Sequence, residues 1–265
     1  MAPRGARIAL IEYGSKGLMG VLTPQANTTV EPELWALMPA HMSIINARLT
    51  SDKDTIEARL VDYTKRFEST ATQFANAPIS VIAAACTGAS YLIGAEAEAK
   101  IVAQMERSYG VPFITAALAS VAALRVMNAC KIALLSPYPD SLNTACKSYW
   151  ESFGFEVIAK AGPKLETDAF HPIYAMTDGG VYRAYEQLSD SGADAVLMLG
   201  TGMATLRPLL AGHEQGLMPA ISCNLALVWA AAQARHWADL EDMHLAGWRT
   251  GLAWSERLNV LFPKK

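Results

Sequence analysis

The sequence has no long hydrophobic run and no excess of charge of one sign. Hydrophobic residues make up 52% of its 265 residues, and 22 Lys and Arg stand against 25 Asp and Glu. This balance provides no cationic field for a phosphate backbone, so no nucleic-acid partner is expected. The longest apolar stretch, residues 79–94, is interrupted by Thr87 and Gly88, and the apolar stretch at 8–11 ends at Glu12. We therefore expect a cytoplasmic protein with no membrane partner.

The sequence also lacks the spacings that mark metal sites and common catalytic centres. Its cysteines are Cys86, Cys130, Cys146 and Cys223, with no CxxC pair among them. A zinc site is not expected, and in a reducing compartment neither are disulfides. There is no GxSxG, HExxH or Walker loop, which disfavours the hydrolase and kinase classes.

Short apolar runs alternate with longer amphipathic segments along the chain. The pattern predicts strands at 79–85, 131–135 and 193–199, and helices at 55–76, 143–153 and 180–189. Strands that alternate with helices form βαβ units, so the fold class is α/β with mainly parallel sheets.

Three short segments recur in the same order and with similar separation. Residues 86–92 match 200–206, residues 111–115 resemble 218–222, and residues 27–29 resemble 143–145. These matches predict two related α/β halves whose loops at 86–90 and 200–204 face each other across a crevice. Ligands of parallel sheets bind at the carboxyl ends of strands, where helix N-termini present free N–H groups. The predicted site therefore lies between the halves and binds an anion.

Cys86 is the candidate reactive residue. It ends the strand at 79–85 and precedes a helix, whose dipole is expected to lower the pKa of the thiol, with the amides of Thr87 and Gly88 beside it. Burial as a small packing residue is the alternative.

Other strand-end residues have both a structural and a functional interpretation. Asn27 and Thr28 precede a helical pattern and either cap that helix or donate hydrogen bonds to a substrate carboxylate. Residues 200–202, Gly-Thr-Gly, resemble the start of a dinucleotide fingerprint but lack its third glycine, so a backbone-amide nest for a carboxylate is the better interpretation. Tyr138 lies in a proline-rich turn and either packs there or offers its hydroxyl to an anion. His171 is a further candidate for lining the crevice.

Together these residues resemble the aspartate/glutamate racemase superfamily, and within it the branch of maleate cis-trans isomerase and arylmalonate decarboxylase. The resemblance rests on Pro24-x-x-Asn27-Thr28-Thr29-x-Glu31, on the strand ending in Cys86-Thr87, on Tyr138 and on the loop at 200–202. It implies two pseudo-symmetric Rossmann-like (flavodoxin-like) domains, which we expect to comprise residues 1–116 with 228–265, and residues 117–227. It also implies a cofactor-independent enzyme, a small carboxylate substrate and a cleft between the domains; assembly into a homo-oligomer stays open.

Members of the superfamily place one cysteine from each half on opposite faces of the substrate. Carried over by the resemblance, Cys86 is the first of these, whereas Gly200 occupies the second position and supplies no thiol. The resemblance places Thr87, Gly88, Tyr138, Thr201 and Gly202 around an anionic substrate. A lone thiol suits decarboxylation, in which Cys86 protonates an enediolate. The known decarboxylase pattern keeps the second-half thiol instead, so protonation here should give the opposite enantiomer.

Three alternatives remain open at this point. The first is maleate-type isomerisation, in which Cys86 adds to the alkene as a thiolate. The resemblance places the isomerase's second-half Asn at Ala169, which lacks its amide. The apolar Ala169-Phe170 pair instead favours a decarboxylase. A racemase or epimerase with a second base other than cysteine, and a carboxylate-binding protein without catalysis, are the others. Residues 7–17 precede the strand expected at 18–23 and are predicted to form an extra strand or a lid.

Overall fold

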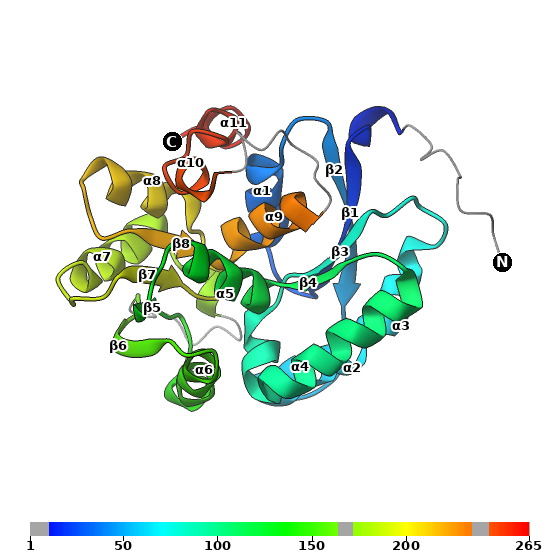
Figure 1. Ribbon diagram of the computed structural model, residues 1–265, viewed down its shortest axis with the longest axis horizontal. Coiled ribbons are helices and arrows are strands. Elements are labelled where there is room, and N and C mark those ends of the chain that lie inside the picture. The colour runs from blue at the N-terminus through cyan, green and yellow to red at the C-terminus, as the bar shows by residue number, and fades with distance from the viewer. Residues whose placement is uncertain (1–10, 164–171, 235–243, 265) are drawn as a thin grey trace.

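The computed structural model describes residues 11–163, 172–234 and 244–264. The first half contains a parallel sheet in the order β2-β1-β3-β4 (Figure 1). Its strands are β1 (Gly17–Pro24), β2 (Met42–Leu49), β3 (Val81–Ala84) and β4 (Phe113–Thr115). The helices that join or follow them are α1 (Val30–Leu37), α2 (Ile56–Lys65), α3 (Phe67–Ala71), α4 (Thr87–Tyr109) and α5 (Ala116–Val126).

The second half repeats this arrangement in the order β6-β5-β7-β8, also parallel. Its strands are β5 (Lys131–Leu135), β6 (Glu156–Ala161), β7 (Ala195–Met198) and β8 (Ala220–Ser222). Its helices are α6 (Asp140–Ser152), α7 (Asp178–Leu188), α8 (Leu206–Glu214) and α9 (Cys223–Ala234), followed by α10 (Leu245–Arg249) and α11 (Ser255–Leu261). The predicted fold class, with two similar α/β halves, is confirmed.

The equivalent strand positions account for two of the three sequence matches. β3 and β7 hold the same place in their sheets, so Cys86 and Gly200 follow equivalent strands. Pro112 and Pro219 likewise directly precede β4 and β8. The third match is looser, because residues 27–29 precede α1 whereas residues 143–145 lie inside α6.

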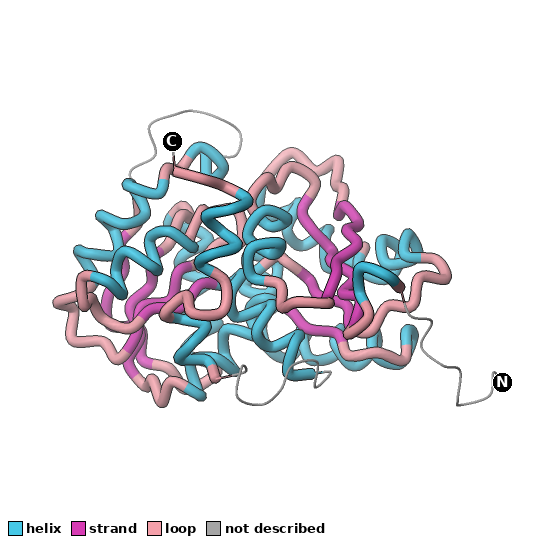
Figure 2. Tube along the Cα trace, turned by 90° about the horizontal axis from the view of Figure 1, so that it is seen from above, coloured by secondary structure: helices cyan, strands magenta, loops and turns pink. Residues whose placement is uncertain are grey.

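The sheets stay apart in space, and helices fill the region between them (Figure 2). α5 packs against α9 at the centre, α9 also contacts α1, and α11 packs on α1 (Figure 1). α11 thus returns to the first half, whereas α10 contacts α8 and α9. The predicted domain limits fall at the start of α5 and inside α9, and they stay a prediction.

Local chemistry explains why the elements begin and end where they do. All residues of β3 and β7 are buried, as expected for strands covered by helices on both faces. The Thr55 hydroxyl caps α2 by accepting from the Ala58 amide, and the helix predicted at 55–76 breaks at Arg66 into α2 and α3. Of the extra strand or lid predicted for 7–17, the strand is wrong for residues 11–16, where Glu12–Gly14 form a 3₁₀ turn. The lid stays a prediction, and residues 7–10 lie outside the described part.

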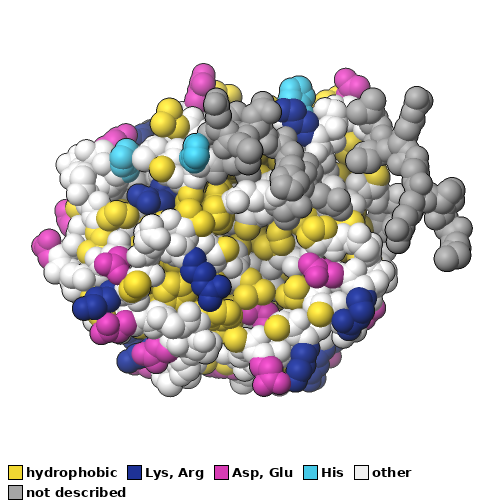
Figure 3. Space-filling view, viewed as in Figure 1, with side chains coloured by type: hydrophobic (Ala, Val, Ile, Leu, Met, Phe, Trp, Pro, Cys, Tyr) yellow, Lys and Arg dark blue, Asp and Glu magenta, His cyan; other side chains and the backbone are white. Residues whose placement is uncertain are grey.

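The surface agrees with the charge balance of the sequence. On the face shown in Figure 3, Lys and Arg side chains are interspersed with Asp and Glu. Within the residues that the structure describes, no helix has the length and hydrophobicity needed to cross a bilayer.

Candidate active site

A cavity of about 260 Å³ opens where the two halves meet, at the carboxyl ends of their strands. Its polar lining comes from the loops after β1, β3, β5 and β7, as the repeat predicts. The predicted residues that line it are Asn27, Cys86, Thr87, Gly88, Tyr138, Gly200, Thr201 and Gly202. Thr28 is exposed and is not among the lining residues, and His171 lies outside the described residues.

Cys86 sits at the junction of β3 and α4, in the N-cap position of the helix. Its side chain is only 5% exposed. Burial raises the pKa of the thiol to about 11, although the Ala89 amide, which donates a hydrogen bond to the sulfur, lowers it. The expected low thiol pKa is therefore wrong, because desolvation by burial outweighs the hydrogen bond from the Ala89 amide. The thiol is neutral at pH 7.

Gly200 occupies the place equivalent to Cys86, and its backbone requires glycine. Its φ of +80° is unfavourable for a residue with a side chain. A Cβ built there would lie 2.8 Å from Pro137 Cγ, 2.9 Å from Ile173 Cδ1 and 3.3 Å from the Tyr138 hydroxyl oxygen. A cysteine at this position would therefore need the cavity wall to move.

Replacing Gly200 with alanine tests this crowding. We expect the free energy of unfolding to fall by about 1–2 kcal/mol from the positive φ and by about 1–3 kcal/mol more from overpacking. Gly154→Ala is the matched control, since Gly154 has φ +89° but no atom within 4 Å of its Cβ position. Equal losses in the two variants, measured by denaturant unfolding, would contradict the crowding.

Thr87 and Tyr138 form a hydroxyl pair across the two halves. Thr87 Oγ1 and the Tyr138 hydroxyl oxygen are 2.9 Å apart, and either group can donate. Burial raises the pKa of Tyr138 well above its usual value, so the phenol is neutral. When Thr87 donates within this pair, the Tyr138 O–H is left to donate to a ligand.

Asn27 combines the two roles that the sequence left open. Its Oδ1 accepts from the Thr29 and Val30 amides at 2.9 and 3.0 Å, so it caps the entry to α1. Its Nδ2 donates to Thr201 Oγ1 at 3.2 Å and leaves one N–H beside the cavity it lines. The Thr201 hydroxyl in turn donates to the Ala85 carbonyl at 2.8 Å. Its only proton is thus committed, and Thr201 can offer a ligand only its backbone N–H.

The sequence did not indicate the apolar wall of the cavity. Ile56, Leu60 and Tyr63 reach it from α2, Leu142 from α6, and Tyr174 from the 3₁₀ turn at Pro172–Ala175. These residues are apolar or aromatic side chains of the kind that pack between elements, so no local signal separates them from packing residues. Burial, with the neighbouring Cys86, raises the pKa of Tyr63 to about 12, so its hydroxyl is a neutral donor.

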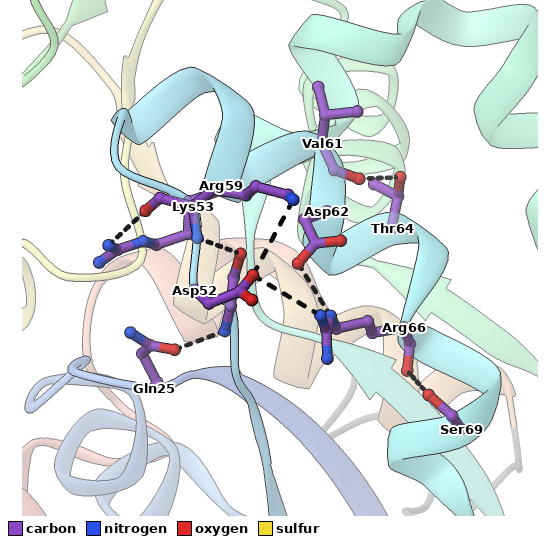
Figure 4. Close-up of polar contacts among 10 residues, drawn as sticks. Gln25, Asp52, Lys53, Arg59, Val61, Asp62, Thr64, Arg66 and Ser69 are labelled. Atoms are coloured by element: carbon purple, nitrogen blue, oxygen red, sulfur yellow. Dashed lines mark hydrogen bonds and ion pairs between the residues drawn. The ribbon is translucent and has the colours of Figure 1, made fainter.

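Polar contacts before α2 and at its C-terminal end hold this helix, which carries part of the apolar wall (Figure 4). Gln25, which follows β1, accepts from the Ser51 amide at 2.7 Å. Arg59 donates to the Lys53 carbonyl at 2.7 Å, and Arg66 pairs with Asp62 at 2.8 Å. Across the described ranges, no cluster of three or more His, Cys, Asp or Glu side chains is arranged to hold a metal ion.

Sequence comparison matches residues 19–243 to the family model for arylmalonate decarboxylase. The chain belongs to the arylmalonate decarboxylase family. It is also similar to two maleate isomerases. The one from Geobacillus stearothermophilus is 25% identical over 80% of this chain and 88% of that protein. The one from Pseudomonas putida is 28% identical, and that match covers 52% of this chain and 60% of the relative.

Solved structures of the same two kinds share the fold of this arylmalonate decarboxylase family member. Maleate isomerase Iso from Pseudomonas putida S16 aligns with a TM-score of 0.74 at 21% identity, over 82% of this chain and 92% of that one. A Nocardia farcinica maleate cis-trans isomerase with a covalent succinylcysteine intermediate aligns at 0.69 and 23%, with the same coverage. A liganded arylmalonate decarboxylase mutant, with one glycine changed to cysteine and one cysteine to serine, aligns at 0.69 and 17%, again with 82% and 92% coverage.

Proposed function

We propose that this protein decarboxylates a small malonate-type diacid and that Cys86 protonates the resulting enediolate. The observation that carries the proposal is a neutral thiol facing a cavity with a largely apolar wall. A protonated thiol is ready to act as an acid, whereas addition to an alkene needs a thiolate. Family membership supports this reaction class.

The reaction proceeds in two steps. The bond between the α-carbon and one carboxylate breaks, its electron pair moves into the remaining carboxylate to form an enediolate, and CO₂ leaves. The Cys86 S–H then donates its proton to the α-carbon, giving the monoacid and a thiolate. Because the pKa of the thiol is about 11, the thiolate regains a proton from water.

The two parts of the cavity have different tasks in this reaction. The free O–H of the Thr87–Tyr138 pair and the amides at the start of α4 stabilise the charge that develops on the enediolate. The apolar wall, which includes Ile56, Leu60 and Leu142, accommodates an apolar α-substituent and solvates a departing carboxylate poorly. We therefore propose an α-substituted malonate rather than malonate itself as substrate.

Maleate-type isomerisation is the second candidate. Its support is the similarity to maleate isomerases and the Ala89 amide, which stabilises a Cys86 thiolate. Under this alternative the substrate must lower the thiol pKa substantially below about 11 before the thiolate can add to the alkene.

Parallel product assays separate the two candidates. The purified protein is incubated with phenylmalonate and, separately, with maleate, and the products are followed by proton NMR. The proposal predicts CO₂ release and phenylacetate, with no fumarate from maleate. Fumarate formation without any decarboxylation would contradict it and favour the isomerase.

A further inference from the structure

Glu33 on α1 is a carboxylate at the contact between the halves, with a side chain only 6% exposed. It accepts hydrogen bonds from the Thr205 amide, from the Leu206 amide at 3.1 Å and from Asn224 Nδ2 at 2.8 Å. The Thr205 hydroxyl lies 3.0 and 3.1 Å from its two oxygens. The first half thus contributes one carboxylate, and all its partners come from the end of the loop after β7, from α8 and from α9.

Asn224 connects this carboxylate to the cavity. The same Nδ2 group that donates to Glu33 also donates to the Thr201 carbonyl at 3.1 Å. Thr201 and Gly202 line the cavity, and Thr29 donates to the Gly202 carbonyl at 2.8 Å. The loop at 200–206 is therefore held at its C-terminal end by Glu33 and near its start by Asn224.

We infer that Glu33 is a positioning residue that, through Asn224 and the start of α8, sets the Thr201 and Gly202 amides against the cavity. This inference rests on the proposed function for its effect on catalysis. Amides that stabilise developing charge act only when they are preorganised, and a displacement of about 1 Å can cost 10²-fold in rate. Glu33 touches no cavity atom and acts through the loop alone.

The hydrogen-bond pattern makes the position of the Thr201 and Gly202 amides depend on the charge of Glu33. The Thr205 and Leu206 amides and the Asn224 Nδ2 can only donate, so the arrangement favours a carboxylate; the proton of a protonated Glu33 needs an oxygen acceptor, which is either the Thr205 hydroxyl or Asn224 Oδ1. Asn224 Oδ1 is buried and has no hydrogen-bond partner among the described atoms. Rotation of the Asn224 carboxamide would let this oxygen accept that proton, and the Nδ2 donor would then leave the Thr201 carbonyl.

Burial raises the pKa of Glu33 to about 7, although its hydrogen bonds lower it. The protonation of Glu33 therefore falls near neutral pH. Of the charged groups on the neighbouring elements, Glu256 of α11 is exposed, and three others have partners away from Glu33. Arg207 of α8 faces Asp178 at 3.8 Å, Glu31 of α1 pairs with Arg48, and Arg257 of α11 binds carbonyls at the far end of α1. His213 and Glu214 lie in the last turn of α8, away from its Glu33 contact, and the sequence of α9 contains no charged residue.

The test follows the Thr201 and Gly202 amides by ¹⁵N NMR of the full chain between about pH 5.5 and pH 8.5. We expect both resonances to titrate together with a midpoint near 7 in the wild type and to stop titrating in Glu33→Gln. Glu31→Gln, a carboxylate change on the same helix, is the matched control and should keep the titration. If neither amide titrates in the wild type, or if both still do in Glu33→Gln, the inference is overturned.

Kinetics supply the second readout. In wild-type decarboxylation, kcat should fall as pH drops below about 7, because Glu33 gains a proton. Glu33→Gln should lower kcat about tenfold at pH 8 with little change in KM, and it should remove this pH dependence. Glu33→Asp should restore part of kcat and part of the pH dependence. An equal pH dependence in Glu33→Gln would contradict the inference. A wild type that decarboxylates no malonate refutes the proposed function alone, since the amide titration still decides the role of Glu33.

Discussion

Replacing Cys86 with alanine is expected to lower kcat for decarboxylation by about 10³-fold, because a positioned general acid contributes about 10²–10⁴-fold. The enediolate would still form at the hydroxyl pair and the amides of α4, but its α-carbon would depend on water for a proton. Affinity for an unreactive malonate analogue should change by less than about threefold, since the thiol makes no ionic contact in its neutral form. Steady-state kinetics and calorimetric titration measure the two effects.

Cys130→Ala is the matched control for this variant. Cys130 is an exposed free cysteine that does not line the cavity, so its loss should leave kcat unchanged. Full activity in Cys86→Ala would refute the role of Cys86 as acid. Tight binding without turnover in the wild type would instead indicate a carboxylate-binding protein without catalysis.

Loss of both hydroxyls of the Thr87–Tyr138 pair is expected to lower kcat by about 10³-fold, the upper end of the range seen when an oxyanion donor is removed. Each single variant, Thr87→Val or Tyr138→Phe, should cost only about tenfold, because the remaining hydroxyl still has one proton to donate. The two single effects should therefore sum to less than the effect of the double variant. A double-mutant cycle on kcat measures this coupling.

Tyr109→Phe controls for the general loss of a tyrosine hydroxyl. Tyr109 donates to the Glu68 carbonyl at 2.7 Å, outside the cavity, so its replacement should leave kcat as it is. Strictly additive single effects, or a double variant with wild-type kcat, would show that the pair does not hold the anion.

The fold was predictable because the chain repeats one α/β pattern. The matches at 86–92 with 200–206, and at 111–115 with 218–222, fall at equivalent strand ends in the two sheets. Such matches reflect the shared strand order of the two sheets, because strand-end loops and buried strands have a restricted composition. The match at 27–29 was weaker because it rests on polar residues that serve equally in a cap or inside a helix.

The sequence predicted which loops line the cavity, but it did not predict the pKa values and hydrogen bonds of the groups in those loops. The sequence located Cys86 at a helix N-terminus but could not reveal that burial outweighs the hydrogen bond from the Ala89 amide in setting the thiol pKa. Nor could it show that the proton of the Thr201 hydroxyl is committed to Ala85. Tyr63 and Glu33 reach the site or its loops only through packing between distant segments, which a single sequence does not encode locally.

The stereochemistry of decarboxylation in D₂O tests the central claim most directly. With an α-methyl, α-aryl malonate as substrate, Cys86 as sole proton donor should deliver deuterium from one face and give a single enantiomer of the monoacid. That enantiomer should be opposite to the product of an enzyme whose thiol lies in the second half, since Gly200 supplies none here. The same enantiomer as that enzyme, or an unchanged yield and enantiomeric excess from Cys86→Ala, would contradict the account.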